Sequence, residues 1–103
     1  MHEAAAKALE FCQGKSQEEI RSDEMRYLAV VQLIEVLGEA ARGITPEFRE
    51  QNPTIPWSNI IGTRDRLSHA YYNINFSIVY SIVSNDLPPL VRQLEAILEA
   101  GSV

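Results

Sequence analysis

The chain has 103 residues, of which 46% are hydrophobic and 22% charged, and this composition predicts one globular domain with a single core. It has no apolar run near the roughly 20 residues that cross a bilayer, and residues 1–7 lack the layout of a secretory signal, so we expect a cytoplasmic protein without a membrane segment. The formal net charge of −5 counts against broad nucleic-acid binding, which usually needs a basic face.

The first part of the sequence predicts two helical segments. An alanine-rich helix is expected over residues 4–13, because Gly14 is a C-terminal stop signal. Ser16 and Glu19 have the spacing of a capping box and begin a short helical piece. The buried face of the first helix is predicted to contain Ala5, Ala8, Leu9 and Cys12.

The strongest helical pattern covers residues 24–42, with Asp23 as its N-cap and Gly43 at its end. Its apolar stripe repeats every three or four residues and consists of Tyr27, Val30, Ile34, Leu37, Ala41 and Ile44. Further apolar residues widen this surface beyond one face: Leu28, Val31, Leu33 and Val36. We therefore expect the helix to pack on two sides, and the second side can be another subunit.

Two further helix starts follow. Thr45–Pro46 combines a capping threonine with a proline at the first helical position, and this helix should end before Asn52–Pro53. Pro56–Trp57 opens a helix that runs to about residue 68 or 69. Its apolar stripe contains Trp57, Ile60, Ile61 and Leu67, and Arg64 falls on the same stripe.

The C-terminal part predicts a helix that is interrupted once. Asn75 is a good cap, and Ile74 can pack against Val79. The prolines at 88 and 89 should kink the helix, with Asp86 capping its continuation until Gly101. The expected core positions are Phe76, Val79, Tyr80, Val83, Leu90, Leu94, Ile97 and Leu98. Residues 1–103 are thus predicted to form one all-α domain, a small antiparallel bundle of four to five helices.

Few residues here suit a metal or a disulfide. Cys12 is the one cysteine, which rules out an internal disulfide and fits a reducing compartment. Together with His2 and His69 it gives no zinc-site spacing. We expect no cofactor and chemistry without a metal, although an oxygen-ligated magnesium stays open.

The candidate chemistry is concentrated where the helix that starts at Trp57 ends. Arg64 can hold a phosphate with its planar guanidinium, and His69 can move a proton near neutral pH, a combination that suits phosphodiester chemistry. On a straight helix, residues five apart point about 140° apart. Either the helix loosens near Ser68, or a second molecule completes the pair across a two-fold axis. A structural alternative is that Asp65 and His69, four apart, merely stabilise a helix end.

Four segments in this order resemble one family. They are Leu37–Ala41 with its Gly-Glu-Ala, Asn52–Trp57, the Arg-x4-His-x-Tyr pattern of Ile61–Tyr71, and Asp86–Leu90. Each is weak alone, but their order and spacing are similar to the HepT-like branch of the HEPN proteins, over most of the chain. The resemblance implies a helical bundle that forms a two-fold dimer, with two Arg-x4-His segments lining a shared cleft. Many members are metal-independent ribonucleases, the toxin halves of toxin–antitoxin pairs.

The resemblance also implies roles for single residues. Arg64 and His69 would be the catalytic pair on an RNA substrate, and Asp65 would orient the site. Tyr71 corresponds to a tyrosine that a minimal nucleotidyltransferase antitoxin modifies with AMP, in assemblies that can be larger than a dimer. Tyr72, Trp57 and Glu39 are expected to be structural or surface residues.

A second function stays open beside the toxin. The first predicted helix is shorter than is usual in the family and the chain is acidic, which leaves room for an inactive or narrowly specific member. In that case the domain would be a non-catalytic, nucleotide-binding interaction module that partners a nucleotidyltransferase.

Overall fold

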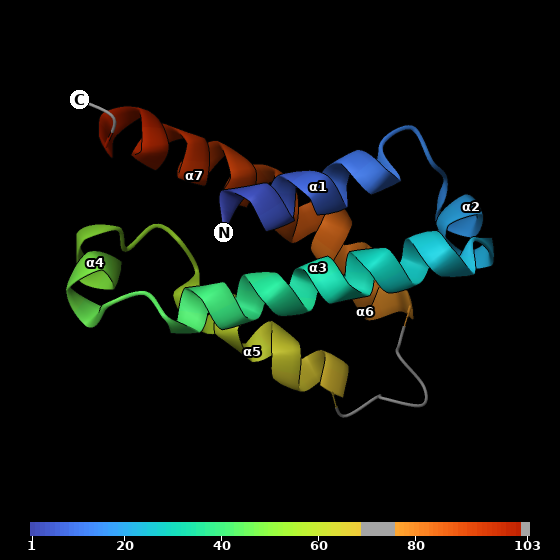
Figure 1. Ribbon diagram of the computed structural model, residues 1–103, viewed down its shortest axis with the longest axis horizontal. Helices are drawn as coiled ribbons and strands as arrows, with labels where there is room; N and C mark the ends of the chain where they lie inside the picture. Colours follow the sequence, from blue (N-terminus) through green and yellow to red (C-terminus); the bar gives the residue numbers. More distant parts are fainter. Residues whose placement is uncertain (69–75, 102–103) are drawn as a thin grey trace.

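The computed structural model describes the backbone of residues 1–68 and 76–101, and within these the side chains of residues 1–63 and 77–99. No strand occurs among these residues, so the all-α prediction is confirmed. Four long elements run alternately in opposite directions, as Figure 1 shows for α1, α3, α5 and the continuous α6–η1–α7. The helices are α1 (His2–Cys12), α2 (Gln17–Ser22), α3 (Glu24–Arg42), α4 (Pro46–Gln51), α5 (Trp57–Ser68), α6 (Phe76–Ser81), η1 (Ile82–Asp86) and α7 (Leu87–Gly101).

Side chains at the predicted caps define where the helices start. In the capping box of α2, the Glu19 N–H donates to Ser16 Oγ and the Ser16 N–H donates to Glu19 Oε1, both at 3.1 Å. At the start of α3, the Arg26 N–H donates to Asp23 Oδ1, and at the start of α4 the Phe48 N–H donates to Thr45 Oγ1. The predicted starts of α2, α3 and α4 are therefore confirmed. They could be predicted because each cap depends only on residues three positions apart.

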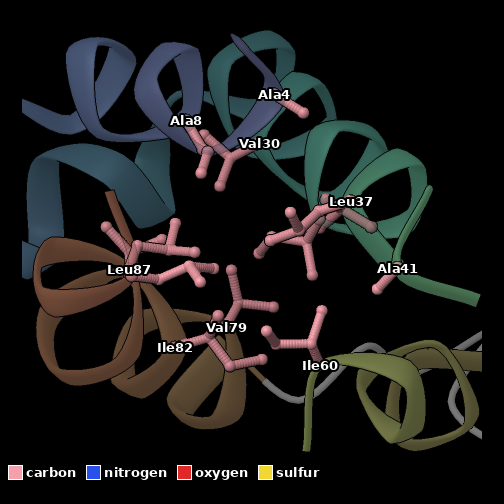
Figure 2. Packing of buried hydrophobic residues seen from close by; sticks show 14 of the residues in the cluster. Ala4, Ala8, Val30, Leu37, Ala41, Ile60, Val79, Ile82 and Leu87 are labelled. Carbon is pink, nitrogen blue, oxygen red and sulfur yellow. The ribbon is translucent and has the colours of Figure 1, made fainter. Parts of the chain in front are cut away.

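The core lies around α3, which packs against α1 on one side and against α5 on another. Helix α1 also packs on α7. In Figure 1 the continuous segment α6–η1–α7 passes behind α3 and α1. Figure 2 shows apolar side chains from these elements pointing toward one centre, among them Leu37, Ile60, Ile82 and Leu87. Burial of this apolar surface holds the helices together, since most of them are too short to be stable alone.

Some predicted positions are different in the structure. His2 lies ahead of the predicted helix start at residue 4 but belongs to α1, where its Nε2 is 3.2 Å from Glu95 Oε1 of α7. Leu98 was expected in the core but is 57% exposed, and the C-terminal end of α7 extends past the start of α1 in Figure 1. Leu9, Tyr80 and Ile97, which were also expected in the core, are only partly buried. The other predicted positions of the first helix, Ala5, Ala8 and Cys12, are buried as expected.

The predicted interruption before Pro88 is a π turn instead of a cap. The backbone stays helical from Ser81 to Leu87, and the Leu87 N–H donates to the Ile82 carbonyl, five residues back. Pro88 and Pro89 have no N–H, so the Ser84 carbonyl lacks a helical donor both four and five residues later. The wider turn relieves the clash between a proline ring and the carbonyl four residues before it. Asp86 therefore lies within η1, and the prediction that it recaps the helix is wrong.

None of the helices within the described residues is long and apolar enough to cross a membrane.

Candidate active site

The start of α5 is anchored by its tryptophan. Trp57 Nε1 donates to the Asn52 carbonyl at 3.0 Å, and the ring meets Phe48 edge-on, with centroids 6.3 Å apart and planes at 73°. The side chain is 8% exposed, which confirms it as a core residue and leaves no stacking platform for RNA. The anchor fixes the direction in which α5 leaves the short helix α4.

The middle of α5 is held by burial along α3. Ile60 and Thr63 are buried, and Thr63 Oγ1 donates to the Asn59 carbonyl at 2.8 Å. Arg64 and Asp65 follow directly in the same helix, so their backbone continues from a packed turn. Their side chains lie outside the described residues, and the interactions predicted for them stay predictions.

His69 and Tyr71 fall within residues 69–75, outside the described residues, as do Tyr72, Ile74 and Asn75. His69 comes directly after Ser68, where α5 has its last described residue. The structure thus places Arg64 on α5 but does not test whether Arg64 meets His69.

A pocket that the sequence did not reveal lies beside α5. Its volume is about 280 Å³, and α3, residues 54–56, α5, η1 and α7 all contribute to it. Six buried apolar side chains form its floor: Ile34, Leu37, Ile60, Ile82, Leu87 and Leu90. Asn59, Asn85 and Asp86 are exposed at its rim. The only signal in the sequence was the spacing of Asn59 and Thr63, which puts two polar residues on one face of α5 just before Arg64.

Gln93 of α7 closes one edge of this pocket. Its Nε2 donates to the Thr54 carbonyl at 3.1 Å and so connects two segments that are 39 residues apart in the chain. Asn85 Nδ2 lies 3.3 Å from Ser81 Oγ, one turn back in the same helix. The amide groups of Gln93 and Asn85 on the rim are therefore partly fixed by protein hydrogen bonds.

Three side chains with shifted pKa values, Asp23, Glu19 and Cys12, lie in or between α1, α2 and α3 and not on α5. A hydrogen bond from the Arg26 backbone N–H, and a second from its guanidinium, lower the pKa of Asp23. The Ser16 backbone N–H likewise lowers the pKa of Glu19. Burial raises the pKa of the Cys12 thiol, which makes it a poor nucleophile at neutral pH.

No group of three or more histidine, cysteine or carboxylate side chains that could hold a metal ion occurs in the described part of the chain. Because Asp65 and His69 are not described at side-chain level, this finding concerns the rest of the bundle.

Comparison with known proteins identifies the family. Residues 1–97 match the family described as ribonuclease HepT-like. The chain is 33% identical to "Putative RNase MJ1380" of Methanocaldococcus jannaschii over 92% of its own length and 87% of that protein. It is 34% identical to "Putative RNase TTE0752" of Caldanaerobacter subterraneus (88% and 81% covered), and 32% identical to "Probable ribonuclease HepT" of Thermococcus cleftensis (76% and 71% covered). No solved structure shows a significant match. The chain belongs to the HepT-like ribonuclease family, as its motifs predicted.

Proposed function

We propose that this HepT-like ribonuclease is a metal-independent endoribonuclease that acts as the toxin of a toxin–antitoxin pair, with Arg64 and His69 as its catalytic residues. The observation that supports this most is the family match over residues 1–97, which includes the whole segment from Arg64 to Tyr71. Several relatives that match most of the chain are named as RNases.

The proposed reaction is an internal transfer within RNA. His69 removes the proton of a ribose 2′-hydroxyl, whose oxygen then forms a bond to the adjacent phosphorus. The bond from phosphorus to the 5′-oxygen of the next nucleotide breaks, and an imidazolium returns a proton to that oxygen. The products are a 2′,3′-cyclic phosphate and a 5′-hydroxyl end. This reaction needs no added water and no metal ion.

Arg64 and Asp65 support this step through charge. The guanidinium of Arg64 would bind two non-bridging phosphate oxygens and stabilise the additional charge of the transition state. Asp65, the next residue in α5, would orient the imidazole or the arginine by a hydrogen bond.

A two-fold dimer would complete the site. If α5 continued straight to His69, Arg64 and His69 would point about 140° apart, so each could pair with the other residue from a second subunit. An exposed apolar surface on α3 supports self-association: Met25, Leu28 and Val36 are 84%, 51% and 45% exposed, and all three lie on one side of that helix. Sedimentation should give a dimer, and Leu28→Lys should shift it toward monomer if this surface is the interface.

Tyr71 would be the point of control in the cytoplasm. A nucleotidyltransferase antitoxin would transfer AMP from ATP to its phenol oxygen and release pyrophosphate. The added phosphate charge beside the cleft would repel RNA. Mass spectrometry after co-expression with such an enzyme should find adenylate on Tyr71. An unmodified tyrosine in a fully neutralised toxin would mean that the antitoxin only covers the cleft.

Cleavage of RNA in the presence of a chelator tests the enzymatic proposal. His69→Ala should slow cleavage by about 10²–10⁴-fold and Arg64→Ala by about 10²–10³-fold. Matched controls are His2→Ala and Arg42→Ala, which remove the same side chains from α1 and from the end of α3. If the wild type cleaves no RNA but binds nucleotides or the nucleotidyltransferase, the domain is the non-catalytic interaction module instead.

A further inference from the structure

The pocket beside α5 has the composition of a site for one flat, uncharged ring. Its floor is apolar and buried, whereas its rim carries the polar groups of Asn59, Asn85, Asp86 and Gln93. Leu37, Ile60, Ile82 and Leu87 belong both to this floor and to the core whose packing Figure 2 shows, so the floor is held in place by the core. At about 280 Å³ the pocket is slightly smaller than most small-molecule sites, a size that suits one ring system better than a longer ligand.

The charge of the rim indicates which part of an RNA can enter. Among the described residues that line the pocket, Asp86 is the single charged one, and none is a lysine or an arginine. A phosphate in contact with these residues would therefore meet the Asp86 carboxylate and no cation. A ring with N–H groups would instead give the carboxylate, which only accepts hydrogen bonds, its matching donors.

The π turn is what brings this carboxylate to the pocket. Ile82, Asn85 and Asp86 all belong to η1, and all three line it. Ile82 contributes to the buried floor, while Asn85 and Asp86 stand exposed above it. Local π turns are frequent at functional sites because they change the direction of side chains without ending the helix.

The pocket lies directly beside the proposed catalytic residue along α5. Asn59, Ile60 and Thr63 line it, and Arg64 is the next residue after Thr63. The rise from Ile60 to Arg64 is about 6 Å along the helix axis. A base in the pocket and a phosphate at Arg64 are therefore close enough to belong to the same or to neighbouring nucleotides.

We propose that this pocket binds one nucleobase of the RNA, and that Asp86 makes guanine the preferred base. Guanine presents two adjacent donors, N1–H and the 2-amino group, which one carboxylate can accept side by side. The amides of Asn59 and Asn85 offer both donors and acceptors to the remaining ring edge. Stacking on an apolar floor together with hydrogen bonds to a base edge is the usual way in which proteins read single-stranded RNA. As a substrate subsite, the pocket rests on the proposed ribonuclease function.

Two nucleosides that carry no phosphate give a direct test. Inosine differs from guanosine only by lacking the 2-amino group. Titration of the ¹⁵N-labelled full chain should shift the amide signals of residues around the pocket. Guanosine should bind about tenfold more tightly than inosine, since it makes one more hydrogen bond to a carboxylate. In Asp86→Asn this difference should disappear, whereas Glu47→Gln, an exposed carboxylate on α4, should preserve it.

Several results would overturn the proposal. One is binding of guanosine and inosine with equal affinity; another is a guanosine preference that survives Asp86→Asn. Pocket signals that move with protein concentration alone would show that a second copy of the chain occupies the groove. Asn59→Ala, which removes an exposed amide from the rim, should also weaken guanosine binding, and failure of both variants to do so would refute the site.

Cleavage assays on the same proteins separate this proposal from the catalytic one. If the wild type cleaves RNA and Asp86→Asn leaves the cleavage pattern unchanged, the base site is refuted while the ribonuclease proposal stands. If guanosine binds with the expected Asp86 dependence but no RNA is cleaved, the base site stands and the ribonuclease proposal fails.

Discussion

Replacing two glycines by alanine should change the stability of this bundle in opposite directions. Gly62 lies in the interior of α5, and a β-carbon built on it has no atom of the described residues within 4 Å. Gly14 follows α1 with a φ of +72°, a conformation that alanine rarely adopts. The same chemical change therefore meets a helical backbone in one case and a left-handed one in the other.

The expected magnitudes follow from these two backbones. Alanine in a helix interior is favoured over glycine by about 0.5–1 kcal/mol, so Gly62→Ala should stabilise the fold by that amount. Placing alanine in the left-handed region costs about 1–2 kcal/mol, so Gly14→Ala should destabilise it. For a domain of this size, each kcal/mol corresponds to roughly 4–8 °C in Tm.

Urea unfolding followed by circular dichroism measures both changes, with Gly43→Ala as a third variant. Gly43 has a φ of −78°, and its added β-carbon would meet backbone oxygens only at 3.5 Å or more, so little strain is expected. If Gly62→Ala lowers the stability, the space beside Gly62 is filled by something other than solvent. If in addition its effect depends on protein concentration, that occupant is a second subunit.

Three further predictions concern contacts around α1 to α3. Arg26→Met should destabilise the fold by about 1.5–3 kcal/mol in urea unfolding, because it removes the 2.6 Å hydrogen bond from the guanidinium to the Phe11 carbonyl; an unchanged midpoint would refute this role. The folded state lowers the pKa of Asp23 and Glu19, so these carboxylates stabilise the fold above about pH 4. This stabilisation is lost as the pH falls through the lowered pKa values. Asp23→Asn should therefore flatten the acid limb of a plot of stability against pH. Cys12, whose thiol pKa is raised by burial, should react with a disulfide reagent only slowly until urea unfolds the chain, and fast labelling of the native protein would contradict its place in the core.

Most of the helix boundaries could be predicted because they depend on neighbours in the sequence. The cap of Asp23 on α3 and the Thr45–Pro46 start of α4 involve atoms no more than three residues apart, and both are confirmed. The exposure of Leu98 and the bond between His2 and Glu95 depend instead on where α1 and α7 meet, which no local pattern contains. The prolines at 88 and 89 predicted a kink with Asp86 as a new cap, but a proline in a helix can be accommodated either by a cap or by a wider turn, and local sequence does not decide between them.

The candidate site was predictable in its residue types but not in its shape. The motif singled out Arg64 and its helix, whereas the pocket beside it joins residues from segments as distant as 34 and 93. Only the packing of α3, α5 and α7 creates that concave surface. The meeting of Arg64 with His69 stays a prediction, since it depends on residues outside those described.

The π turn also makes the length of one short segment as important as its composition. A π turn contains one residue more than an α turn, so every residue after η1 is rotated by about 100° relative to an uninterrupted α-helix. Loss of one residue between 82 and 86 would leave an ordinary α turn and keep the buried side chains of Leu90 and Leu94 where they are. If the full-length chain took the α register here instead, α7 would rotate, and Gln93 would move away from the Thr54 carbonyl. In this family member, therefore, a single-residue deletion in η1 should be better tolerated than loss of the π turn at full length.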